Sequence, residues 1–254
     1  MSVVSSLALT IPILLIFLLR LGTYRSFPAL LVYYSSSLVY ILLSENYIHA
    51  SPAFVRGWGL TNNLMDIPLI LFFMTYFSTS KVFSQRMHGV IAAYLVFEII
   101  VLFIVGFNVS TITITLGPGL AIVFCLSLYF FIRQAKMAIE HRKATGKALM
   151  TAAVLFAYGC YSFIYLMYYV FKAHLDRFGQ VRPQYKNDTF LIFFFATTLS
   201  SILMSIGLLI ERKRIRKLNE LKVTRKELSS IYPETKKAAP YRTAMLDFDK
   251  EQWN

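Results

Sequence analysis

The sequence predicts an all-α integral membrane protein, organised as a bundle of seven transmembrane helices. Its composition is the first observation, because 57% of the 254 residues are hydrophobic, only 15% are charged and the mean hydropathy is +0.57. The second observation is that the apolar residues form runs long enough to cross a bilayer, which soluble domains lack. The third is the uneven distribution of Lys and Arg between the connecting segments.

The seven predicted spans follow one another with short connections. By hydropathy they cover residues 3 to 19, 27 to 44, 60 to 77, 89 to 107, 111 to 132, 148 to 171 and 189 to 210. The first is a span rather than a signal peptide, because no basic residue precedes it and no cleavage pattern follows before Arg20. The fifth begins irregularly, with alternating Thr and Ile. Since proline suits a first helical turn, its regular helix is expected from near Pro118 to about Met137.

Charge distribution predicts the orientation of the bundle. Of the 26 Lys and Arg residues, 21 lie on the side that carries the C-terminus and five on the other side. Without the residues after Ile210, the numbers are nine and five. The positive-inside rule therefore places the N-terminus outside and the C-terminus in the cytoplasm. Residues 1 to 210 form the transmembrane domain, and residues 211 to 254 form a basic cytoplasmic helix with a loosely ordered tail.

The third span contains a carboxylate, which is a functional-site hypothesis by default at membrane depth. Asp66 lies about six residues, or 9 Å, below the outer start of this span. Asn62 is four residues earlier on the same helix face, where its amide could donate to the carboxylate, and Asn63 flanks it. Asp66 either bonds structurally to a neighbouring helix or binds a ligand, an ion or a proton.

Hydroxyl side chains recur at helical spacing in three other spans. They are Tyr33, Ser37, Tyr40 and Ser44 in the second span, Tyr158, Tyr161, Tyr165 and Tyr168 in the sixth, and Thr197, Ser201 and Ser205 in the seventh. Because lipid cannot satisfy hydroxyls, these stripes are expected to face inward, toward Asp66. They either form a polar pocket among spans two, three, six and seven, or simply hold the helices together.

Glu98 is a second acidic residue inside a span, about nine residues or 13 Å from the cytoplasmic start of span four. No basic residue within any span can pair with it, which favours a carboxyl bonded to a tyrosine or to water, or one that binds a proton or ligand. A metal site is not assigned, because Glu45 and His49 have suitable spacing but no third ligand. Cys125 and Cys160 lie in apolar runs and suggest no disulfide framework.

A basic segment follows the last span. Strong helix formers continue to about Ile231, so the seventh helix is expected to extend into the cytoplasm. Anionic lipid headgroups or a cytoplasmic protein are the expected partners of Arg212, Lys213, Arg214, Arg216 and Lys217. A solvated collar that only fixes orientation is the alternative. The bilayer and other membrane proteins are expected partners, and nucleic acid is not.

Seven helices, an outside N-terminus, a carboxylate in span three and an aromatic sixth span resemble the microbial rhodopsins in outline. That resemblance implies retinal bound through a lysine in the middle of the seventh span. Residues 189 to 210 contain no lysine, so covalent retinal is not expected and no cofactor is assigned.

The sequence favours a sensor or signalling component with a polar pocket around Asp66. A small-molecule or proton-coupled transporter and an accessory subunit of a larger membrane complex are the alternatives. An intramembrane enzyme is less favoured, because the histidines lie outside the apolar core. The candidate ligand- or proton-binding residues are Asp66, Asn62, Asn63, Glu98, Tyr40, Tyr161, Tyr165, Thr197 and Ser201.

Overall fold

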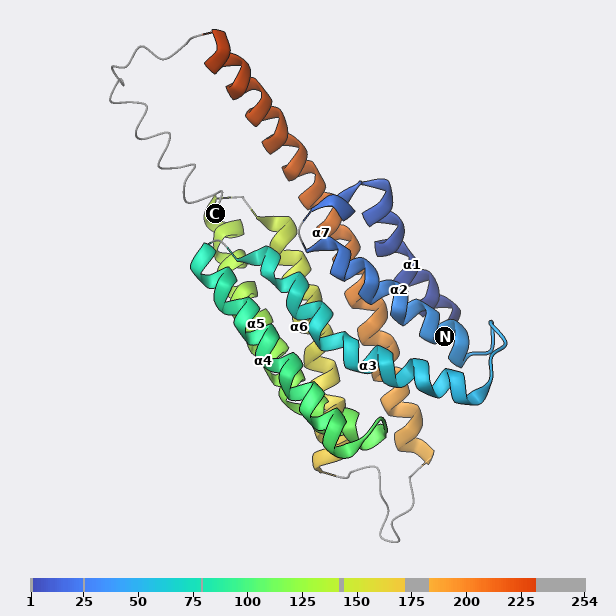
Figure 1. Ribbon diagram of the computed structural model, residues 1–254. Helices are drawn as coiled ribbons and strands as arrows, with labels where there is room; N and C mark the ends of the chain where they lie inside the picture. The colour runs from blue at the N-terminus through green and yellow to red at the C-terminus, as the bar shows by residue number, and fades with distance from the viewer. Residues whose placement is uncertain (1, 25, 79, 142–143, 172–182, 232–254) are drawn as a thin grey trace.

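The computed structural model describes residues 2–24, 26–78, 80–141, 144–171 and 183–231, and these residues are helical apart from short connections (Figure 1). The α-helices are α1 (Ser2–Leu18), α2 (Phe27–Ser44), α3 (Pro52–Met74), α4 (Lys81–Val105), α5 (Val109–His141), α6 (Thr145–Tyr165) and α7 (Pro183–Ile231). Short 3-10 helices, Leu21–Thr23 and Thr75–Phe77, follow α1 and α3, and a π-helical turn, Leu166–Val170, follows α6. The predicted all-α class is confirmed over these residues.

Six of the helices, α2 to α7, contain a stretch long and apolar enough to cross a membrane. The first helix is also apolar but has 17 residues. Large apolar side chains cover the outside of the bundle, and among them Phe103 is 86% and Ile104 79% exposed. So much exposed apolar surface is energetically unfavourable in water, whereas lipid tails solvate it well. The chain is therefore a helical, multi-pass membrane protein.

Packing between the helices forms a ring with one helix outside it. Helix α1 packs against α2 and α7, α2 against α3, α3 against α5, α5 against α6, and α6 against α7. Helix α4 contacts α3 and α5 from the outside. The N-terminus lies at the end of the bundle opposite to the projecting part of α7 (Figure 1). Side chains of α3, α6 and α7 thus meet inside the ring.

Helix α3 begins at Pro52, eight residues before the predicted start of the third span. The Ser51 hydroxyl accepts a hydrogen bond from the backbone N–H of Phe54 at 3.3 Å, and proline is favoured in the first turn. Asp66 is fourteen residues beyond Pro52, about 21 Å along the helix axis. It therefore lies well inside the helix, deeper than the 9 Å expected from the hydropathy boundary.

Helix α5 begins at Val109, so the expectation of a regular helix starting near Pro118 is wrong. Gly106, with φ 83°, ends α4, and the side-chain oxygen of Asn108 accepts the backbone N–H of Thr111 at 3.1 Å. Threonine hydroxyls in the first turns bond to carbonyls of their own helix, as Thr113 does to Val109 at 3.1 Å. This N-terminal cap and these local bonds stabilise a helical start despite the alternation of Thr and Ile.

Helix α7 is continuous from Pro183 to Ile231, which confirms the predicted continuation of the last apolar helix into the basic segment. It crosses α6 with the two backbones in contact. A Cβ added to Gly146 would lie 2.7 Å from the backbone nitrogen of Glu211 and 2.9 Å from the carbonyl oxygen of Gly207. Only glycine permits this approach. The predicted loosely ordered tail, residues 232 to 254, lies outside the described residues.

Candidate functional site

Asp66 is held from across the bundle by a tyrosine of α6. The hydroxyl of Tyr158 donates a hydrogen bond to Oδ1 of Asp66 at 2.9 Å, and Tyr158 is fully buried. Tyr33 of α2 lies close to the same hydroxyl. Among the described residues Asp66 forms no ion pair. The Asp66 carboxylate is therefore held by the hydroxyl of Tyr158, with Tyr33 close to the same group.

The two asparagines before Asp66 bond to groups other than its carboxylate. Asn62 accepts a hydrogen bond from the Ser36 hydroxyl of α2 at 2.7 Å, and the Asn63 amide donates to the carbonyl of Gly59 at 2.8 Å. Residues four apart on an α-helix are offset by about 40°, because a turn has 3.6 residues. That offset lets Asn62 face α2 while Asp66 faces α6. The expected hydrogen bond between Asn62 and Asp66 is replaced by the bond from Tyr158.

Three of the predicted residues gather between α6 and α7. The Tyr161 and Thr197 hydroxyls are hydrogen-bonded at 2.9 Å, and Ser201 donates to the Thr197 carbonyl at 2.7 Å. The ring centroids of Tyr158 and Tyr161 are 5.6 Å apart, which joins this group to the Asp66 pair. The result is a polar layer inside the bundle, built by α3, α6 and α7. Tyr158, which belongs to the predicted stripe, is the member that reaches Asp66.

Two other predicted residues lie elsewhere, Tyr165 of α6 against α5 and Glu98 on α4. The Tyr165 hydroxyl donates to the carbonyl of Thr113 on α5 at 3.0 Å and packs against the backbone at Gly117. Glu98 on α4 is buried, and its Oε1 has no hydrogen-bond partner among the described residues. Tyr94 lies beside Glu98 and donates to the Thr115 carbonyl at 3.2 Å. Tyr165 and Tyr94 thus bond to α5, and none of these residues is hydrogen-bonded to the Asp66 pair among the bonds of the described residues.

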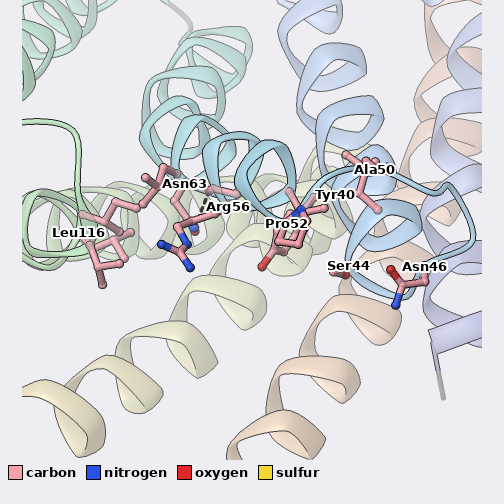
Figure 2. A pocket seen from close by; sticks show the side chains of 14 residues that line it. Tyr40, Ser44, Asn46, Ala50, Pro52, Arg56, Asn63 and Leu116 are labelled. Atoms are coloured by element: carbon pink, nitrogen blue, oxygen red, sulfur yellow. Dashed lines mark hydrogen bonds between the residues drawn. The ribbon is translucent and has the colours of Figure 1, made fainter.

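A pocket of about 550 Å³ opens at the end of the bundle where α2 ends and α3 begins (Figure 2). The lining side chains of α3 lie between those of α5 and those at the end of α2 (Figure 2). Of the predicted residues, Tyr40 and Asn63 line it. Arg56 also lines it and was not predicted, because in the sequence it reads only as a charge near a helix start. The remaining lining residues are Leu43, Ser44, Asn46, Ala50, Pro52, Val55, Gly59, Leu60, Val109, Ile112 and Leu116.

A second buried carboxylate lies at the opposite end of α3, where α7 leaves the bundle. Oε1 of Glu211 accepts hydrogen bonds from the Tyr76 hydroxyl at 2.6 Å and from the Arg214 guanidinium at 3.0 Å. Glu211 is 1% exposed, and its Oε2 has no hydrogen-bond partner among the described residues. The ammonium of Lys147 lies 4.6 Å from the centre of the Tyr76 ring. This group, the Tyr76–Glu211 cluster, connects α3, α6 and α7.

Sequence reasoning missed the Tyr76–Glu211 cluster because Glu211 opens a run of basic residues and reads as part of a solvated helix. The available signal was a single carboxylate placed directly after the apolar residues of the last span. The cluster also changes the role of one predicted lipid-binding residue. Arg214 turns toward Glu211, and Arg216 pairs with Glu220 at 2.9 Å, whereas Lys213 and Lys217 are exposed.

Within the part of the chain that the structure describes, no group of three or more His, Cys, Asp or Glu residues converges as metal ligands do. The polar layer and the pocket contain hydroxyls, amides and a guanidinium, which suit hydrogen bonding to an organic ligand. No protein-family model, no curated protein and no solved structure matches this chain.

Proposed function

We propose that this protein is a seven-helix membrane sensor that binds a small molecule in the pocket between α2, α3 and α5. The observation that carries the proposal is the position of α3. One end of this helix lines the pocket through Arg56 and Asn63, and the 3-10 turn that directly continues its other end, Thr75–Phe77, contacts α7 through Tyr76. A single helix thus connects the pocket to the helix that leaves the bundle.

The middle of α3 supports the same function. Asp66, less than one turn beyond Asn63, is bonded to Tyr158 of α6. In this proposal a ligand that changes the position of α3 acts on this bond and on the Tyr76–Glu211 cluster, because both lie along α3 and the 3-10 turn that continues it. A ligand produces such a shift only by binding the two arrangements with different affinity. The basic part of α7 is the output element in this proposal.

Seven spans complete the proposed topology. Helix α1 buries Ala8, Leu9 and Ile16 against the bundle, while its opposite face exposes apolar residues such as Leu7 and Leu14. Its 17 residues cover about 25 Å, close to the thickness of a hydrocarbon core of about 30 Å. With seven spans, the positive-inside rule puts the N-terminus and the pocket outside and the basic part of α7 in the cytoplasm.

The cytoplasmic part of α7 has two proposed partners. Lys213 and Lys217 are exposed and suit anionic lipid headgroups, to which each basic side chain contributes on the order of 1 kcal/mol. The second proposed partner is a cytoplasmic protein that binds the same surface in a way that depends on the position of α7. The bundle itself offers apolar faces to lipid and to other membrane proteins.

A proton-coupled carrier is the second candidate function. Its supporting observation is the buried Glu98, which lies within electrostatic range of Asp66 and has an oxygen without a hydrogen-bond partner among the described residues. Buried ionisable groups inside membranes often belong to proton relays. An accessory subunit of a larger complex would instead use the exposed apolar faces.

Mass spectrometry of the protein purified from its native membrane tests the binding step. The full-length protein should carry a small molecule in near-stoichiometric amount. Leu116→Trp, which fills the pocket, should remove that molecule. Leu128→Trp is the matched control, because Leu128 is on the same helix, 40% exposed and not part of the lining. If both variants lose the bound molecule, or both retain it, the molecule does not bind in this pocket.

Distance measurement tests the signalling step. Spin labels at Gln85→Cys on α4 and Lys213→Cys on α7, in a background with Cys125→Ser and Cys160→Ser, report the position of α7. Occupied wild-type protein and Leu116→Trp should give different distance distributions. Identical distributions with a molecule bound would exclude a sensor and leave a carrier or a binding subunit.

A further inference from the structure

We infer that the pocket between α2, α3 and α5 binds an amphipathic anion, a molecule with one carboxylate or phosphate head and a short apolar body. The inference rests on the proposed function and specifies the chemical class of its ligand. It is argued from the charge, the polar groups and the apolar wall of the pocket.

The charged side chain in the pocket lining indicates the charge that the ligand carries. Arg56 is the one charged side chain in the lining, as far as the described residues go, and a guanidinium stays protonated and binds carboxylate or phosphate oxygens in pairs. Glu45 stands between Ser44 and Asn46, which both contribute to the lining, but its own side chain is exposed and does not. Arg56, itself exposed at the edge of the pocket, is therefore the one lining group, among the described residues, that can pair with an ionic ligand, and the ligand that it suits is an anion.

Polar groups beside Arg56 suit the same head. The amide of Asn63 uses one of its two hydrogens on the Gly59 carbonyl, which leaves one for a ligand. Tyr40 packs directly over Gly59, where an added Cβ would lie 2.8 Å from its ring. Glycine at this position makes room for the ring and holds the tyrosine at the wall of the pocket. A hydroxyl and an amide thus accompany the guanidinium.

Apart from Ser44 and Asn46, the rest of the wall consists mainly of apolar residues, and these come largely from three helices. Leu43 belongs to α2, Leu60 to α3 and Ile112 and Leu116 to α5. An inorganic anion would make no contact with the apolar part of the lining, and an uncharged apolar molecule would make no hydrogen bond to Arg56. A volume of about 550 Å³ falls in the range of small-molecule sites. Only a ligand with an anionic head and an apolar body contacts both the polar and the apolar residues of the lining.

An amphipathic anion has two sources, a soluble organic acid or an anionic phospholipid of the surrounding bilayer. Both present an anionic head attached to an apolar body. The experiment distinguishes them by the lipid in which the protein is embedded.

Radiolabelled decanoate is the probe, measured on the full-length protein in nanodiscs of phosphatidylcholine. We expect saturable binding that decanol, which has the same chain without the charge, displaces at least tenfold less well than unlabelled decanoate. Arg56→Gln should weaken binding at least tenfold, and Arg56→Lys should restore part of it. Arg86→Gln is the matched control, because Arg86 is exposed on α4 and outside the pocket.

Equal displacement by decanol, or equal binding in wild type and Arg56→Gln, would overturn the inference. Leu116→Trp should abolish binding at an unchanged melting temperature, and full binding in a folded Leu116→Trp protein would overturn the assignment to this pocket. Phosphatidylglycerol in the nanodiscs should lower the apparent decanoate affinity if a lipid phosphate occupies the pocket. Unchanged affinity would support a soluble acid as the occupant.

The two proposals fail separately. A folded protein that ignores decanoate but carries another molecule dependent on Leu116 would overturn the anion class and leave the sensor. Decanoate binding that depends on Arg56 without any movement of α7 would overturn the sensor and leave the anion site.

Discussion

Two carboxylates of this bundle, the half-buried Asp66 and the buried Glu211, are each held by a tyrosine hydroxyl from another helical segment. Tyr158 donates to Asp66 at 2.9 Å and Tyr76 donates to Glu211 at 2.6 Å. Hydrogen bonds between helices in a membrane typically contribute on the order of 0.6 kcal/mol, and removal of one partner from a buried pair costs about 1–3 kcal/mol. Variants that keep the shape but change the charge therefore separate structural from functional roles.

Asp66→Asn keeps an oxygen that accepts the Tyr158 hydroxyl, so we expect the free energy of unfolding to fall by less than about 1 kcal/mol. Asp66→Leu leaves Tyr158 without an acceptor and should lower it by about 1–3 kcal/mol. Unfolding in detergent measures both. Met65→Leu, at an exposed neighbouring position, is the control.

Ligand-dependent movement of α7 gives the functional readout for the same residue. We expect the folded Asp66→Asn protein to lose this movement, because the variant removes the ionisable carboxyl group between α3 and α6. A normally folded Asp66→Asn protein that still moves α7 would show that Asp66 is structural.

Glu211→Gln should destabilise the protein by about 1–3 kcal/mol, because it leaves the charges of Lys147 and Arg214 without their buried counter-charge. Glu220→Gln is the matched control on the same helix. The Glu220 side chain is 61% exposed in its pair with Arg216, and surface pairs contribute about 0–1 kcal/mol. Chemical unfolding of both variants makes the comparison, and equal effects would contradict a structural role for the cluster.

At the scale of elements, the crossing of α6 and α7 depends on glycine. A Cβ at Gly146 meets the backbone of α7 at 2.7 Å, whereas a Cβ at Gly89 of α4 has nothing within 4 Å. We expect Gly146→Ala to lower the melting temperature through overpacking of about 1–3 kcal/mol. Gly89→Ala should leave it unchanged or raise it, since alanine favours helix by up to about 1 kcal/mol. An unchanged melting temperature in Gly146→Ala would mean that α6 and α7 can move apart at this position at little energetic cost.

The basic part of α7 should contribute unequally to lipid binding. Phosphatidylglycerol enrichment around the full-length protein in mixed-lipid nanodiscs measures this. Replacing both Lys213 and Lys217 by Gln should lower enrichment, because each exposed charge contributes on the order of 1 kcal/mol near an anionic surface. Arg214→Gln should lower it less, since Arg214 is bonded to Glu211. An equal loss per charge would indicate that Arg214 is free to face lipid.

At the scale of the whole molecule, topology is the first property to test. Single cysteines at Ser110 and Thr224, in a background without Cys125 and Cys160, lie at opposite ends of the bundle and both positions are exposed. A membrane-impermeant maleimide should label position 110 on intact cells and position 224 only after permeabilisation. The reverse pattern would overturn the proposed orientation and place the pocket in the cytoplasm.

The sequence by itself determined the helical membrane class and the continuous last helix, because both depend on local composition. Apolar runs without partners for their backbone groups must be helical in lipid, and strong helix formers after Ile210 extend the last one. Helix starts were less predictable. Caps by Ser51 and Asn108 lengthened α3 and α5 beyond the limits set by hydropathy and by proline.

Only the tertiary structure decided which polar groups meet. The sequence placed Asn62 and Asp66 on one helix face, yet α2 and α6 approach that face from different directions and each takes one of them. In the sequence Arg56 and Glu211 are ordinary charges at the edges of apolar runs, and the position of Glu211 directly after the last apolar run does not reveal Tyr76 as its partner. Which residues far apart in the chain become hydrogen-bond partners depends on how the helices cross. The close contact at Gly146 sets this crossing for α6 and α7. The helical periodicity of the sequence carries no information about it.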